Sequence, residues 1–297
     1  MTNGNNKEIF KVCSEGDELE KLEQLIAAGA DIEARTEAGR TPLMVACLAG
    51  NFNFVRKLIK HGADVSAQDN KSFSVIHFAV EGSSGSIKLL AQAGADINAQ
   101  TKQGYTPLMM ACEIGKITAM ENLCSLGANT ALTTAKNAGP IVVALNSVKA
   151  WSASNAQKMV RILLAGGVSV GYQCTSTGSS EIHIAAQKIE DDRYRDKPRY
   201  AIFNAIAKAG DNPWRKNKLG AMAIDYLAET DLVHVKSGLK AYAKNAEQEV
   251  LSQITSLRGL QAYRLIYPKK PLDKILKSLT LTDVEREKLQ AELDALG

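Results

Sequence analysis

Residues 39–43 read Gly-Arg-Thr-Pro-Leu, and residues 104–108 read Gly-Tyr-Thr-Pro-Leu. In the same phase, Gly-Ala-Asp stands at 29–31, 62–64 and 94–96, and Gly-Ala-Asn stands at 127–129. The successive spacings of these glycines are 33, 32 and 33 residues. Because the first marker, in two copies, keeps the same phase as the second, in four, they indicate an internal repeat rather than a chance coincidence.

Each copy contains signals for two short helices. Thr41 is a suitable N-cap, and the following proline fits the first helical position, where its missing N–H costs nothing. Gly50 can end this helix in a left-handed conformation. Residues 54–59 then place Phe, Val, Leu and Ile on one stripe of a second helix, which Gly62 ends. The pattern predicts a helix–turn–helix unit followed by an extended, turning finger.

This unit resembles the ankyrin repeat, most strongly over residues 38–134, and residues 6–37 resemble a degenerate first copy. The resemblance implies an all-α solenoid of stacked helix–turn–helix units with β-hairpin fingers. We expect an array of about six to seven repeats over residues 1–235, with insertions near 147–155 and 189–200. Residues 236–297 are expected to form a helical C-terminal cap or a small module, because a stack needs a cover for its last apolar face.

The C-terminal residues predict two further helices. Residues 272–279 follow two prolines and read as a short helix. Residues 282–285, Thr-Asp-Val-Glu, form a capping box at the start of the other. That second helix would offer four side chains for packing: Val284, Leu289, Leu293 and Leu296.

Composition fits a globular protein with a modest basic excess. The chain has 297 residues, 45% of them hydrophobic, and a net charge of +4. The first 150 residues carry 14 Lys/Arg against 15 Asp/Glu, and the remainder carries 22 against 17. This excess does not predict nucleic-acid binding. With no apolar segment near the N-terminus and no run of about 20 apolar residues, we expect a cytoplasmic protein without a membrane span. We also expect it to be a monomer.

The histidines and cysteines fall at packing positions of the repeat. His77 and His183 occupy the helix position that Met44 and Met109 occupy in other copies, so they are expected to make structural hydrogen bonds. The cysteines at 13, 47 and 112 share a small-residue packing position. No metal-ligand spacing, phosphate loop or nucleophile motif occurs. We therefore expect no catalytic residue, no metal and no cofactor; an enzyme active site in the atypical C-terminal half is the alternative.

Interface-type side chains recur at equivalent positions of the repeats. Arg40, Phe73 and Tyr105 each directly precede a helix cap, and Arg and aromatics carry much of the energy of protein interfaces. Val45, Phe78 and Met110 add a row on the first helices. The hypothesis is that these six residues face a partner protein; the alternative is that the aromatics pack on their own fingers and the row is core.

A second candidate surface is basic and aromatic. The insertions bring Trp151 and the arginines Arg193, Arg195 and Arg199, and Trp214 lies in a nearby finger. These residues predict docking of an acidic partner or a phosphate-bearing surface. The alternatives are a nucleic-acid or phosphoinositide site, or a solvated loop. Separately, the residues before Asn98 resemble the context recognised by asparaginyl hydroxylases that act on ankyrin repeats, which predicts hydroxylation there.

The sequence thus favours a non-catalytic scaffold that holds another protein, of unknown identity, through the concave face of its array. Bacterial effectors often combine such arrays with insertions and a unique tail. A bacterial ankyrin-repeat effector acting in a host cytosol is therefore one hypothesis for its origin.

Overall fold

A computed structural model describes residues 2–16, 18–147, 153–171, 173, 177–190 and 197–295. The chain divides into two compact units. Unit 1 comprises residues 1–135 together with 146–150 and 165–167, and unit 2 comprises the remaining residues. The described residues are organised as α-helices joined by turns, so the predicted all-α fold is confirmed.

Unit 1 is built from helix pairs. Its helices are α1 (Thr2–Glu15), α2 (Leu19–Ala27), α3 (Pro42–Leu48), α4 (Phe52–Lys60), α5 (Val75–Glu81), α6 (Ser86–Gln92), α7 (Pro107–Ile114) and α8 (Ile117–Ser125). The predicted caps are present: the Thr41 hydroxyl accepts from the Met44 N–H at 3.3 Å, and Thr106 does the same for Met109 at 3.2 Å. The Thr-Pro-Leu marker therefore starts a helix, as expected.

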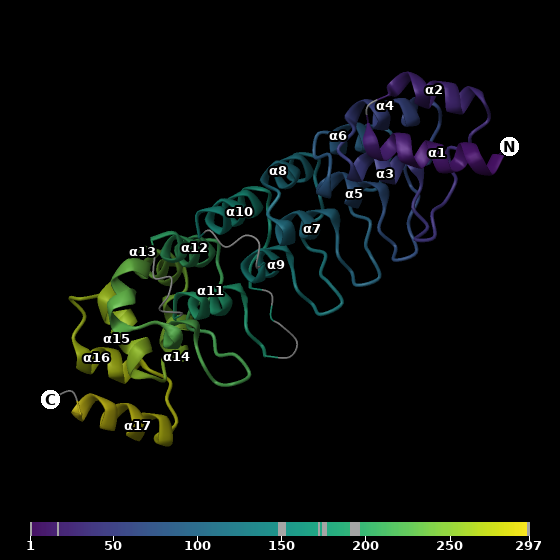
Figure 1. The fold of residues 1–297 in the computed structure, drawn as a ribbon. Coiled ribbons are helices and arrows are strands. Elements are labelled where there is room, and N and C mark those ends of the chain that lie inside the picture. The colour runs from purple at the N-terminus through teal and green to yellow at the C-terminus, as the bar shows by residue number, and fades with distance from the viewer. Residues whose placement is uncertain are drawn as a thin grey trace. The chain divides into compact units, whose positions relative to one another are not determined.

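Successive pairs of unit 1 stack in two rows. Helices α1, α3, α5 and α7 follow one another in one row and α2, α4, α6 and α8 in the other, with the finger loops extending on the side of the first row (Figure 1). Helices of the first row approach one another closely, and the small side chains Ala46 and Cys47 of α3 are fully buried. At Gly82 a Cβ would lie only 2.0 Å from the Leu48 carbonyl oxygen, so only glycine fits there.

The fingers of unit 1 are joined to one another by hydrogen bonds. Asn70 donates from its side chain to the Glu37 carbonyl at 2.9 Å, and Lys102 donates to the Asn70 carbonyl at 2.7 Å. The finger of the third pair folds back on itself at an antiparallel bridge between Gln68 and Ser74. Neighbouring repeats are therefore fixed in register at their tips as well as through their helices.

Unit 2 continues with helices of more varied length. They are α9 (Pro140–Asn146), α10 (Ala153–Ala165), α11 (Glu181–Glu190), α12 (Lys197–Lys208), the 3₁₀ helix η2 (Ala223–Tyr226), α13 (Glu229–Asn245), α14 (Glu247–Gln253), α15 (Leu257–Ile266), α16 (Leu272–Ser278) and α17 (Asp283–Asp294). Helix α13 runs through the domain boundary expected between 235 and 236. Most of the insertion expected near 189–200 is helical where it is described, since α11 ends at 190 and α12 starts at 197.

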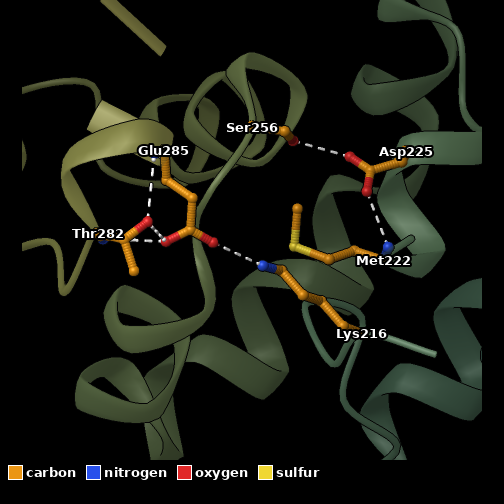
Figure 2. A network of polar contacts seen from close by, with 6 residues as sticks. All are labelled: Lys216, Met222, Asp225, Ser256, Thr282 and Glu285. Carbon is orange, nitrogen blue, oxygen red and sulfur yellow. Dashed lines mark hydrogen bonds and ion pairs between the residues drawn. The ribbon is translucent and has the colours of Figure 1, made fainter. Parts of the chain in front are cut away.

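Polar contacts help to attach the C-terminal helix α17 (Figure 2). Thr282 and Glu285 form the predicted capping box, and Glu285 also pairs with Lys216 of the last finger at 3.0 Å. In the same region Ser256 donates to Asp225, which in turn accepts from the Met222 N–H. Of the four expected packing residues, Leu289 is buried and Leu293 half-buried, but Val284 is 76% exposed and Leu296 lies outside the described residues.

Candidate protein-binding surface

Three equivalent turns present Arg40, Phe73 and Tyr105. In each turn the residue four positions earlier makes hydrogen bonds to both the backbone N–H and the backbone carbonyl of Arg40, Phe73 or Tyr105. The Thr36 N–H donates to the Arg40 carbonyl at 3.0 Å, and the Thr36 hydroxyl accepts from the Arg40 N–H at 3.1 Å. Asp69 and Thr101 repeat this arrangement for the other two turns. The three side chains are therefore held on fixed backbone rather than on free loops.

Two of these side chains meet a third predicted residue. The Arg40 guanidinium carbon lies 5.0 Å from the centre of the Phe78 ring, a cation–π geometry. The Phe73 ring lies 6.2 Å from that of Phe78, in a tilted arrangement. Phe78 itself is buried, with 4% of its surface exposed, so the prediction that it faces a partner is wrong. Its ring instead supports the two half-buried side chains above it.

The remaining predicted residues of unit 1 are partly open to solvent. Val45, Tyr105 and Met110 are half-buried, like Arg40 and Phe73. We call these five residues the finger surface: Arg40, Val45, Phe73, Tyr105 and Met110. They come from the turns before α3, α5 and α7 and from the exposed side of α3 and α7, which lie in one row (Figure 1). The surface therefore joins an arginine, two aromatic and two aliphatic side chains on a repeated framework.

His77 couples two neighbouring repeats beneath this surface. Its Nδ1 accepts from the Ser74 N–H at 3.2 Å, and its Nε2 lies 3.1 Å from the Tyr105 carbonyl oxygen. Since a carbonyl can only accept, Nε2 carries the proton and the ring is neutral. Burial lowers the pKa of His77 from 6.5 to about 4. The structural hydrogen-bonding role predicted for His77 is confirmed.

His183 repeats the same arrangement in unit 2. Its Nδ1 accepts from the Ser180 N–H at 3.3 Å, and its Nε2 lies 3.3 Å from the Ala221 carbonyl oxygen. Burial also lowers its pKa. Ala221 is held by Asn217 as Tyr105 is held by Thr101. The last finger thus carries alanine at the position where unit 1 carries arginine or an aromatic residue. The sequence did not reveal this equivalence, because the last finger lacks the Thr-Pro-Leu marker.

Two residues of the second predicted surface are buried in unit 2. Trp214 is 0% exposed, and its ring centre lies 6.3 Å from that of Tyr242 on α13. Arg199 is 5% exposed and donates from Nη1 to the Lys188 carbonyl, which ties α12 to the end of α11. The prediction that these two side chains contact a partner is wrong, because helical packing covers both. Trp151, Arg193 and Arg195 lie outside the described residues.

Asn98 has a structural role in its finger. Its backbone N–H donates to Asp96, and its side-chain oxygen accepts from the Asn129 N–H at 2.7 Å. The side chain is half-buried and connects one repeat to the next. Hydroxylation of Asn98 stays a prediction.

Three of the cysteine thiols are buried. Burial raises the pKa of the Cys13 thiol to about 12, and it raises those of Cys47 and Cys112 as well. The thiolate form that a nucleophile needs is thus disfavoured at these positions. Within the described ranges no group of three or more His, Cys, Asp or Glu side chains has a metal-binding arrangement. In the same part of the chain, every helix is too short or too polar to cross a bilayer.

Comparison with known proteins identifies the repeat. Residues 9–101 match the family model for ankyrin repeats, in three copies. The chain is 30% identical over 137 residues to human transient receptor potential cation channel subfamily A member 1, covering 44% of this chain and 12% of the channel. It is 41% identical over 73 residues to the ADP-ribosylation factor GTPase-activating protein AGD2 of Arabidopsis thaliana, covering 25% and 9%. It is 30% identical over 96 residues to mouse protein fem-1 homolog A-like, covering 32% and 14%.

Residues 9–101 of this chain therefore contain ankyrin repeats. The family match begins at residue 9 and so includes the first copy, which lacks the Thr-Pro-Leu marker. Ankyrin repeats generally serve as protein–protein interaction modules. The chain spans between 9 and 14% of the length of the three relatives, so the activities that their names state belong to those proteins.

Proposed function

We propose that this protein is a non-catalytic scaffold that binds a partner protein through the finger surface of unit 1. The observation that carries the proposal is the cluster of Arg40 and Phe73 over the buried Phe78 ring. Interface energy concentrates in such arginine and aromatic residues. Their backbone is already fixed by the turns, so less conformational entropy would be lost on binding.

The side chains that different repeats carry at the position of Arg40 also support a role in binding a partner. Arg40, Phe73 and Tyr105 share one backbone geometry but differ in side chain. A position that only had to stabilise the finger would be served by any small residue, as Ala221 serves the last finger of unit 2. The varied side chains therefore fit a role in recognising a partner.

Affinity capture with quantitative mass spectrometry tests the proposal. The test protein is the full chain with Arg40→Ala, Phe73→Ala and Tyr105→Ala. The matched control carries Phe52→Ala and Arg56→Ala, which remove an arginine and an aromatic from the exposed side of α4. We expect the triple variant to lose its specific partners by at least tenfold and the control to retain them. If both proteins capture the same set, the finger surface is not the binding site.

The proposal extends to the oligomeric state and the cellular location of the protein. We propose a cytoplasmic monomer, which size-exclusion chromatography with light scattering checks directly. Delivery into a host as a bacterial effector stays a prediction, tested by looking for the protein in host cytosol during infection. If the protein has an enzymatic activity that the triple variant keeps and that requires unit 2, this would indicate catalysis by the C-terminal half.

A further inference from the structure

A pocket opens in unit 2 between α14, α15 and α16. Its volume is about 350 Å³, within the range of ligand-binding pockets. Its lining includes Leu251 of α14, Tyr263 of α15, Lys269 and Lys270 of the connecting turn, and Lys274 and Ile275 of α16. None of these residues belongs to the finger surface.

The floor of the pocket is apolar and fixed. Leu251 is 6% exposed and Ile275 only 2%. Tyr263 is buried, and its hydroxyl donates to Glu247. Lys270 also pairs with Glu247, and its Nζ lies 4.8 Å from the centre of the Tyr267 ring. One wall is thus a closed network in which the charge of Lys270 is already neutralised.

The rim carries cations that have no such partner. Lys269 and Lys274 are exposed, and within the described part of the chain neither has an ion pair. Residues 264–277 contain five Lys/Arg and one Asp. This segment accounts for the whole net charge of +4, so the rest of the chain is neutral in balance. Three of these five cations, Lys269, Lys270 and Lys274, line the pocket with the apolar floor.

We infer that this pocket docks an acidic peptide segment of a partner protein. An apolar side chain of the peptide would cover Leu251 and Ile275, while flanking carboxylates would meet Lys269 and Lys274. Charge complementarity selects an acidic ligand. The apolar floor favours a peptide over a bare phosphate, which has nothing to place there. Ile266 and Ile275 are turned inward, so these two side chains are not available to insert into a membrane surface.

The site goes beyond the proposed function, because it lies in a different unit and has different chemistry. The feature that the pocket recognises is an apolar residue between acidic ones.

Fluorescence anisotropy with a labelled ten-residue peptide tests the inference. The probe has a central leucine flanked by glutamates, and the comparison peptide has serine in place of leucine. The full chain is tested as wild type, as Lys269→Glu with Lys274→Glu, and as a control with Lys236→Glu and Lys240→Glu. The control lysines are exposed on α13 of the same unit and give an identical change in net charge.

We expect the pocket variant to bind the leucine peptide at least tenfold more weakly than wild type, and the control to change by less than twofold. The serine peptide should bind wild type at least fivefold more weakly than the leucine peptide. Equal losses in both variants, or equal binding of both peptides, would overturn the inference, since net charge alone would then explain the result.

Two further measurements keep the result decisive. Far-UV circular dichroism checks that each variant is folded, and Lys269→Gln with Lys274→Gln gives a milder change that should shift binding in the same direction. Sedimentation with phosphatidylserine vesicles tests the membrane alternative. If the vesicles bind in a Lys269- and Lys274-dependent way while the peptide does not bind, the ligand is a lipid surface and the peptide assignment is wrong.

Discussion

Replacing His77 with methionine should make the protein less stable than wild type at neutral pH and more stable than wild type at acidic pH. Methionine is the residue that the chain itself places at the equivalent positions 44 and 109, where both side chains are fully buried. The substitution therefore suits the site sterically and removes only the imidazole. At pH 7 the variant loses the hydrogen bond from Nε2 to the Tyr105 carbonyl, which should cost about 1 kcal/mol.

The effect of acid follows from the His77 pKa. Burial lowers it from 6.5 in the unfolded chain to about 4 in the folded protein. As the pH falls between these values, the unfolded chain takes up a proton that the folded protein does not, so the folded state loses stability. The loss is complete below the folded pKa and amounts to about 3 kcal/mol. Protonation of Nδ1 would also break the bond from the Ser74 N–H.

Wild type should therefore be about 1 kcal/mol more stable than His77→Met at pH 7 and about 2 kcal/mol less stable at pH 4. Urea unfolding followed by circular dichroism measures the difference at each pH, and the groups common to both proteins cancel. NMR titration of the His77 imidazole carbon-bound proton checks the pKa directly. A stability difference that does not change with pH, or a pKa near 6.5, would refute the reasoning.

Three other outcomes follow from the packing. Gly82→Ala should destabilise unit 1 by about 2 kcal/mol or more, because its Cβ would meet the Leu48 carbonyl oxygen at 2.0 Å. Gly85→Ala, whose Cβ would enter open space, should change the stability by no more than about 0.5 kcal/mol. Urea unfolding of the two variants measures both effects. Trp214→Ala should cost about 3–5 kcal/mol, as expected for a large core side chain, and unchanged thermal unfolding would contradict its burial. Lys216→Met should cost no more than about 1 kcal/mol, because its ion pair with Glu285 is partly exposed. The pKa of Glu285 is lowered to about 2 by its bonds to Thr282 and Lys216. The stability that this ion pair contributes is therefore present above about pH 4.5 and lost as the pH falls towards 2. If salt changes the unfolding of wild type and of Lys216→Met equally near pH 7, the pair does not contribute.

The repeat could be predicted because its signals are local. Thr41 caps a helix through the backbone N–H three residues later, and Gly115 ends one with a φ of 73°. Such effects depend on neighbours in the chain, so the residue types reveal them. The same holds for the capping box at Thr282 and for the two histidines, whose first partner lies three residues away.

The candidate sites were harder to predict because exposure depends on distant residues. Phe78 and Phe73 are both aromatic and near the same cap, yet one is buried and the other half-buried. Trp214 has a basic, aromatic sequence context typical of an exposed finger, but Tyr242 and its helix cover it. The basic pocket was missed for the same reason: Leu251 and Lys274 lie 23 residues apart and meet only through the packing of α14, α15 and α16.

The amino-acid sequence by itself determined the repeat, its phase, the helix starts and ends, and the hydrogen bonds of the histidines to their own helix caps. All of these depend on contacts within a few residues or on one constant period. The neutral state of His77 follows instead from its burial and from the Tyr105 carbonyl of the next repeat. The tertiary structure alone decided which aromatic and basic side chains remain open to a partner. That outcome depends on which helices pack over which fingers, and such packing joins residues that no local pattern connects.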